Sequence, residues 1–198
     1  MKLNVVVEDS ADSGGNYAFR HLLFRSLSRD VREVLASPES LTLHAAKGNG
    51  KVVDMLARNG SRYLNETACP ILVLLDGDKV RRLLGIDARA CRTQVHGSFL
   101  SHVRKACAGV DADRVELCLL EANMESVLSV CLSIHPVPYE GKLHSPLARE
   151  AIINGFLAST SQSDRFERLK SDLPSFGRLV HRIEHHVREH ATAPSAGA

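Results

Sequence analysis

A run of five large apolar residues between a proline and an acidic turn places the strongest constraint on the fold of this chain. The run, Ile71 to Leu75, follows Pro70 and ends at Asp76-Gly77-Asp78. An unbroken apolar run of this length is typical of a strand buried on both faces, as in the middle of a parallel sheet. Because such a strand needs helices on either side, the sequence predicts an α/β fold.

The acidic turn after this strand is the first candidate site. Asp76 and Asp78 are separated by one glycine and lie at the carboxyl edge of the predicted sheet, where open α/β folds keep their sites. Two ionised carboxylates so close repel each other unless a cation lies between them or one stays protonated. A hard, oxygen-seeking ion such as Mg²⁺ or Mn²⁺ would resolve this. The alternative is a plain acidic turn, since Asp-Gly is a common turn pair.

Apolar periodicity predicts the other elements. The predicted strands are residues 3–7, 41–44, 71–75 and 114–120, and the predicted helices include 17–29, the segments around Leu56, Val80 to Leu84 and Phe99, and the stretches 146–158, 164–172 and 174–187. We therefore expect an α/β domain over residues 1–135, with a central, mostly parallel sheet of about four strands flanked by helices. A C-terminal helical extension over 136–190 should pack on it, and 191–198 should form a flexible tail.

Composition describes an ordinary globular protein. The 198 residues are 44% apolar with a formal net charge of +2, which indicates nothing specific about nucleic acid. No apolar run approaches the length of a membrane span, and the N-terminal stretch turns acidic at Glu8, too early for a signal peptide. We expect a cytoplasmic protein without a membrane partner. The five cysteines form no Cys-x-x-Cys pair and are interpreted as reduced core residues.

Two further motifs have competing interpretations. The turn Lys47-Gly-Asn-Gly-Lys51 before a helix resembles a phosphate-binding turn but lacks the full P-loop pattern, so a plain turn is favoured. The segment His181-Arg-Ile-Glu184-His185 matches the H-x-x-E-H pattern of inverted zinc peptidases. With ten histidines in the chain, a chance match on a solvated helix face is favoured.

The acidic residues as a set resemble the Toprim domain, a fold shared by topoisomerases, bacterial primases and several nucleases. That domain has a glutamate after its first strand and an Asp-x-Asp after a later one, and Glu8, Asp76 and Asp78 occupy those places. The usual first motif is Val-Glu-Gly-x-x-Asp, and here Asp9 stands where glycine is expected. The turn is thereby less free to adopt positive φ.

The chain is also similar to a small Toprim-like family often encoded beside ATPases in bacterial defence islands. The turn ending at Lys51 resembles that family's glycine- and lysine-rich turn. The segment from Asn123 to Leu128 resembles its Ile-Glu-x-Trp-Leu motif, with Val127 in place of tryptophan, and Leu173-Pro-Ser-Phe176 resembles its closing Cys-Pro-x-Phe helix. The resemblance implies an anti-phage defence role with a partner ATPase.

The function expected from this resemblance is that of a divalent-metal-dependent phosphodiesterase, namely a DNA or RNA nuclease. Asp76 and Asp78 would bind Mg²⁺ or Mn²⁺, and Glu8 would share a second ion or act as general acid/base. Asp12 is predicted to be a further metal ligand, and Glu125 to complete the group of acidic residues around the ion. Lys51 or Lys79 is predicted to neutralise a phosphate oxygen. The sequence is also compatible with a homo-oligomer.

Two alternatives stand beside the nuclease. Asp9 and Val127 depart from the motifs and favour a catalytically degenerate binding or regulatory subunit. The segments ending at Glu8 and Asp76 also resemble a response-regulator receiver, in which the strand-end aspartate accepts a phosphoryl group. The receiver is less favoured, because the gap between the two segments is too long and the Met-Pro expected after the phospho-acceptor is missing.

Overall fold

A computed structural model describes residues 1–8, 13–46, 48–120, 124–143, 145–158 and 162–191. The chain divides into two compact units, neither of which is contiguous in sequence. The first, here called the sheet unit, comprises residues 2–10 and 42–121. The second, the helical unit, comprises residues 1, 11–41 and 122–198. The boundary expected at residue 135 lies within the helical unit.

The sheet confirms the predicted fold class. Its strands are β1 (Leu3–Glu8), β2 (Leu41–Ala46), β3 (Ile71–Asp76) and β4 (Val115–Leu120), in the parallel order β2-β1-β3-β4. In the register of the central pairs, Val7 lies opposite Leu74, and Leu74 lies opposite Cys118. Residues 71–75 of β3 are all buried, as the apolar run predicts. The run therefore forms a central strand.

The strand order reverses direction between β1 and β3. From β1 the chain first adds β2 on one side, and then returns to add β3 and β4 on the other. Two adjacent strands whose connections leave in opposite directions form a topological switch point, where open α/β sheets bind their ligands at the carboxyl ends. In this sheet the carboxyl ends at the switch point are Glu8 and Asp76.

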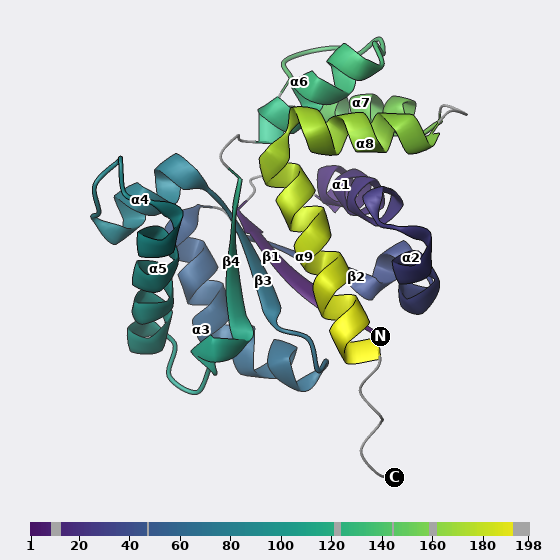
Figure 1. The fold of residues 1–198 in the computed structure, drawn as a ribbon. Helices are drawn as coiled ribbons and strands as arrows, with labels where there is room; N and C mark the ends of the chain where they lie inside the picture. Colours follow the sequence, from purple (N-terminus) through teal and green to yellow (C-terminus); the bar gives the residue numbers. More distant parts are fainter. Residues whose placement is uncertain (9–12, 47, 121–123, 144, 159–161, 192–198) are drawn as a thin grey trace. The chain divides into compact units, whose positions relative to one another are not determined.

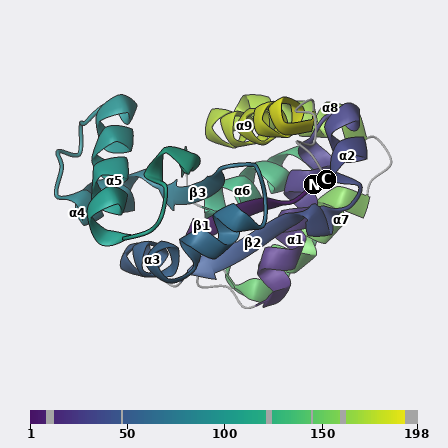
Figure 2. The same cartoon turned by 90° about the horizontal axis from the view of Figure 1, so that it is seen from below.

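One face of the sheet is covered by α3 (Asn49–Asn65), α4 (Gly77–Leu84) and α5 (Arg92–Ala106). Figure 1 shows these three helices gathered on one side of the strands, and Figure 2 shows α4 and α5 side by side. Their apolar residues form one core with Val73 and Leu75 of β3, in which Val52, Leu56 and Phe99 are fully buried. A short 3₁₀ turn, Ala112–Arg114, leads into β4. This core holds the helix that begins at the candidate site.

The helical unit contains the remaining elements. They are α1 (Ser13–Ser26), α2 (Arg29–Leu35), the 3₁₀ turn Pro38–Ser40, α6 (Met124–Ile134), α7 (Pro146–Ala158), α8 (Gln162–Asp172) and α9 (Pro174–Ala191). Apolar periodicity predicts α1, α7, α8 and α9 among these elements, but not α2 or the 3₁₀ turn. The helix α2 has seven residues and only two buried ones, Val31 and Leu35. So short a stripe falls below what periodicity detects.

The corner between α8 and α9, visible in Figure 1, depends on a glycine. A Cβ placed on Gly177 would lie 2.8 Å from the backbone oxygen of Lys170. Because real Cβ atoms do not approach an oxygen so closely, any side chain at this position would force the two helices apart. Leu173, at the corner itself, is buried, and the next residue, Pro174, begins α9. At the C-terminal end of α9, the tail expected over residues 191–198 lies outside the described residues, except for Ala191.

Polar contacts tie α2 to α9 within the helical unit. The Glu184 carboxylate accepts a hydrogen bond from the backbone N–H of Ser28 at 2.6 Å, at the N-cap of α2. The Arg188 guanidinium donates to Asp30 Oδ2 at 2.9 Å and to the Ser28 hydroxyl at 2.8 Å. The hydrogen bond from Arg188, and then the one from Ser28, hold the pKa of the Asp30 carboxyl well below its usual range.

This lowered pKa makes the α2–α9 contact dependent on pH. Because the folded-state pKa of Asp30 lies below the unfolded value of about 3.9, its contribution is fully present above that value and is lost as the pH falls. We expect Asp30→Asn to be slightly less stable than the parent protein at pH 7, and the difference to shrink as the pH falls below about 4. Urea denaturation midpoints across this range measure it. Glu33→Gln, whose partner Arg29 lies on the same helix, is the control. A difference that persists undiminished at low pH would contradict this role for Asp30.

The cysteine prediction is confirmed for four of the five thiols. None of the five forms a disulfide bond, and Cys69, Cys107, Cys118 and Cys131 are buried. Burial raises the pKa of the Cys131 thiol to about 12, which leaves it unreactive. Cys91 differs, because it is exposed at the N-cap of α5. Among the described helices, none is long and apolar enough to cross a membrane.

Candidate acidic site at the carboxyl edge of the sheet

Two of the predicted acidic residues end adjacent parallel strands. Glu8 is the last residue of β1 and Asp76 the last of β3. Because the two strands are parallel, with Val7 opposite Leu74, both side chains are delivered to the same edge of the sheet. The strand pairing therefore brings together residues that are 68 positions apart in sequence.

The ammonium group of Lys79 lies between these two carboxylates. Its Nζ is 3.3 Å from Glu8 Oε1 and 3.9 Å from Asp76 Oδ2. The repulsion expected between closely placed carboxylates is thus relieved by a lysine on the first turn of α4. Since about half of the Lys79 side chain is exposed, solvent screens both ion pairs and each contributes little to stability.

One oxygen of Glu8 has no such partner. The Glu8 side chain is 9% exposed, and its Oε2 is buried without a hydrogen bond among the described residues. Leaving a buried charged acceptor unsatisfied costs free energy, so native proteins supply a hydrogen bond or a cation to such an atom. This oxygen is the atom of the site that a further cationic or hydrogen-bonding group would satisfy.

Asp76 is positioned by its role as the N-cap of α4. Its Oδ1 accepts a hydrogen bond from the backbone N–H of Asp78 at 3.1 Å. Arg81 fixes the start of the helix, because its guanidinium donates to the carbonyl oxygens of Gly77 at 3.0 Å and Ala90 at 3.1 Å. Oδ2 of Asp76 is thereby directed toward Lys79, while Asp78 is exposed in the first turn of the helix.

The three predicted metal ligands that the structure describes do not form a closed cluster. Among the described residues, Glu8, Asp76 and Asp78 are not a group whose ligand oxygens all lie within 4.8 Å of one another. The structure brings two of them, Glu8 and Asp76, around one ammonium group. A divalent ion bound by all three would therefore require Lys79 to move and the carboxylates to draw together.

The remaining predicted site residues are more dispersed. Lys51 is exposed on the first turn of α3 and pairs with Asp54 at 3.2 Å. The preceding Gly48 has φ of +97°, a conformation that favours glycine and accounts for the glycine of the Lys47–Lys51 turn. Glu125 lies on the first turn of α6 in the helical unit. Asp12, like Asp9 of the first motif, lies outside the described residues.

The zinc-peptidase interpretation of residues 181–185 finds no support in the geometry. The central acid of that pattern, Glu184, is only 14% exposed and is engaged by the Ser28 N–H and by Arg188. Its carboxylate therefore ties α2 to α9. Sequence reasoning missed a different group on the same helix, formed by His185, His186 and Glu189. The signal that could have found it is an adjacent histidine pair with an acid one turn later.

We compared the chain with protein-family models, with curated proteins and with solved structures, and none of the three comparisons gives a match. The resemblance to Toprim domains therefore stays a prediction from the motifs.

Proposed function

We propose that the chain is a divalent-metal-dependent phosphodiesterase, with nucleic acid as its substrate. The observation that carries the proposal is the placement of Glu8 and Asp76 at a topological switch point, with a buried Glu8 oxygen that has no hydrogen bond among the described residues. An electrostatically incomplete acidic site at this place in the fold is typical of a ligand site.

The residues present suit a hard cation. Glu8, Asp76 and Asp78 offer only carboxylate oxygens, which are the ligands that Mg²⁺ and Mn²⁺ prefer. Such an ion, when bound, would cancel charge on the phosphate, lower the pKa of a water molecule and stabilise the departing oxygen. A nuclease needs all three effects, which favours a hydrolytic role over a purely structural one.

The chain's own groups would then have separate tasks. Asp76, fixed as the N-cap of α4, and Glu8 would hold the ion, and Glu8 would also accept the proton of the attacking water. Lys79 leaves its place between the carboxylates and neutralises a non-bridging phosphate oxygen. Lys79 thus serves as an internal counter-ion in the resting site and as a phosphate ligand in the working one.

The biological setting proposed is a bacterial anti-phage defence system with an ATPase partner. Its support is the motif resemblance around Lys51, Glu125 and Phe176. The substrate is proposed as DNA or RNA without a choice between them.

A regulatory subunit remains the second candidate, and one observation favours it. Lys79 pairs with both Glu8 and Asp76, so the chain itself supplies a cation to the two carboxylates, as a degenerate site would require. The receiver-like alternative is weaker, because the described chain continues from β4 into helices α6 to α9 with no fifth strand for the conserved lysine of a receiver.

A cleavage assay separates these candidates. The protein should be incubated with plasmid, single-stranded DNA and tRNA in Mn²⁺ or Mg²⁺, with and without an ATPase encoded beside its gene. Addition of a chelator is the control. We expect cleavage that requires the metal and is removed by the chelator. Absence of cleavage under all these conditions would favour the regulatory subunit.

The double role of Lys79 gives a further prediction. Replacing it by methionine removes a cation that competes with the metal, so Lys79→Met should bind Mg²⁺ about thirtyfold more tightly, since a unit charge and a divalent ion at about 4 Å repel each other by on the order of 2 kcal/mol in a water-like dielectric. The same variant should cleave more slowly, because the phosphate loses its positive partner. Titration calorimetry and the cleavage assay measure the two effects.

The control for this prediction is Lys105→Met, which removes an exposed lysine from the last turn of α5. Its Mg²⁺ affinity should match that of the parent protein. An unchanged affinity in Lys79→Met would show that the lysine and the ion do not share one site.

A further inference from the structure

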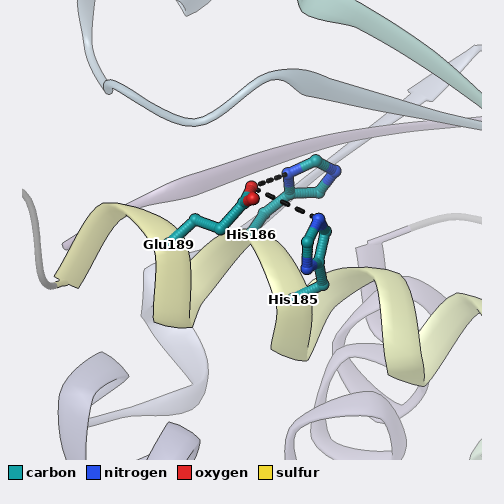
Figure 3. A group of neighbouring side chains, drawn as sticks. All are labelled: His185, His186 and Glu189. Atoms are coloured by element: carbon teal, nitrogen blue, oxygen red, sulfur yellow. Dashed lines mark ion pairs between the residues drawn. The ribbon is translucent and has the colours of Figure 1, made fainter.

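Two histidines and a glutamate converge on one side of α9. Figure 3 shows the imidazole rings of His185 and His186 directed toward the carboxylate of Glu189. His185 Nε2 is 3.3 Å from Glu189 Oε2, and His186 Nδ1 is 3.8 Å from the same oxygen. The ligand atoms of all three residues lie within 4.8 Å of one another. Among the described residues this is the one group of metal-ligating side chains so closely placed.

These distances suit the coordination shell of a zinc-class ion. With ligand bonds of about 2.0–2.1 Å, two ligands of a tetrahedral site lie about 3.4 Å apart. Both imidazole-to-carboxylate distances are close to that value, and they meet at a single oxygen. Two histidines with one carboxylate form a ligand set that binds catalytic zinc in known enzymes. Only small side-chain movements would be needed to close it around an ion.

The helix gives the group a fixed spacing. Glu189 follows His185 by four residues and His186 by three, so both pairs lie on neighbouring turns of α9. The His186 side chain is 12% exposed, whereas those of His185 and Glu189 are about half exposed. An ion can therefore enter from solvent and retain water as its fourth ligand. Because the helix holds the three backbones, little ordering is needed on binding.

We propose that His185, His186 and Glu189 form a binding site for a borderline-soft divalent metal ion of the zinc class. The site is separate from the acidic edge of the sheet by its chemistry, since imidazole nitrogen suits zinc whereas a set of carboxylates suits Mg²⁺. A bound ion would cross-link the last turns of α9, beside Arg188, which ties this helix to α2. The proposal does not depend on the phosphodiesterase activity.

Two alternatives compete with this site. The contacts of His185 and His186 with Glu189 would serve as ion pairs if the imidazoles were protonated. A different pair of histidines on α9 could also chelate the ion. His181 precedes His185 by four residues, which is also a metal-binding spacing on a helix. The two chelates share His185 but differ in every other ligand. A substitution of His181 therefore tests the rival chelate alone, and a substitution of His186 or Glu189 tests the proposed site alone.

The test uses the full-length protein and two readouts. Titration calorimetry with Zn²⁺ gives stoichiometry and affinity, and the visible absorption of added Co²⁺ reports tetrahedral coordination. We expect one ion per chain and intense Co²⁺ absorption. Affinity should fall by about tenfold or more in His186→Ala and in Glu189→Gln, the latter being nearly isosteric and therefore compatible with the helix. It should change little in His181→Ala and in the control His96→Ala, which lies on α5.

Each other outcome overturns the proposal. Loss of binding in His181→Ala, with His186→Ala unaffected, assigns the ion to the rival pair. No Zn²⁺ binding, or equal binding in all variants, leaves the group as ion pairs only. Zn²⁺ titration of Asp76→Asn distinguishes the site on α9 from the acidic site, because loss of Zn²⁺ binding in this variant would place the ion at the edge of the sheet.

Discussion

Asp76→Asn is expected to abolish metal-dependent cleavage while the protein stays folded. Asparagine caps a helix as well as aspartate does, so the hydrogen bond to the Asp78 N–H can be kept. The change removes the negative charge that would hold the cation and that now lies near Lys79. Because the proposed chemistry needs the ion at this ligand, the rate should fall by at least on the order of a hundredfold.

The matched control is Asp87→Asn in the loop after α4. Asp87 also accepts a hydrogen bond from the backbone N–H two residues later, that of Arg89, and it is exposed. The two substitutions therefore make the same chemical change in the same local geometry. The rate should be unaffected by Asp87→Asn. Cleavage that survives Asp76→Asn at the parental rate would identify a contaminant or a different active site.

Phe99→Ala should have the largest effect on stability. Phe99 is fully buried on α5 in the core between the helices and the sheet. Truncation of a buried phenylalanine to alanine costs about 3–5 kcal/mol, from lost apolar burial and from the cavity left behind. Since domains of this kind are stable by only about 5–15 kcal/mol, the loss should lower the free energy of unfolding by a large fraction.

Urea denaturation followed by circular dichroism measures this loss. Ser101→Ala, at an exposed position on the same helix, should change the free energy of unfolding by less than about 0.5 kcal/mol. Phe99→Leu, which keeps most of the volume, should lie between the two. A Phe99→Ala variant as stable as the parent protein would contradict the assignment of α5 to the core of the sheet unit.

The elements that could be predicted from the sequence are those whose burial leaves a periodic or continuous apolar signal. The strand β3 is buried along residues 71–75, and α9 carries its buried residues at helical spacing, so both were identified. The helix α2 was not, because Val31 and Leu35 alone give too little signal. The sequence also does not predict that α1 belongs to one unit with α6 to α9, because that unit is formed by contacts between segments far apart in the chain.

The candidate site was predictable in part for the same reason. Parallel pairing of the first and third strands forces Glu8 and Asp76 to one edge, and this follows once both strands are recognised. The place of Lys79 between them depends on where α4 begins, and that is set by the Asp76 cap. The cluster on α9 spans residues 185–189 and shares only His185 with the H-x-x-E-H pattern of residues 181–185, whose Glu184 carboxylate holds α2 instead.

The central claim is that Glu8 and Asp76 together hold one hard divalent cation, and Mg²⁺ titration calorimetry tests it most directly. Mg²⁺ is the appropriate ion because it prefers oxygen ligands and would not report on the histidines of α9. We predict one Mg²⁺ per chain at millimolar concentration or below, with affinity reduced about tenfold in Glu8→Gln. No binding by the parent protein, or equal binding by Glu8→Gln, would contradict the account.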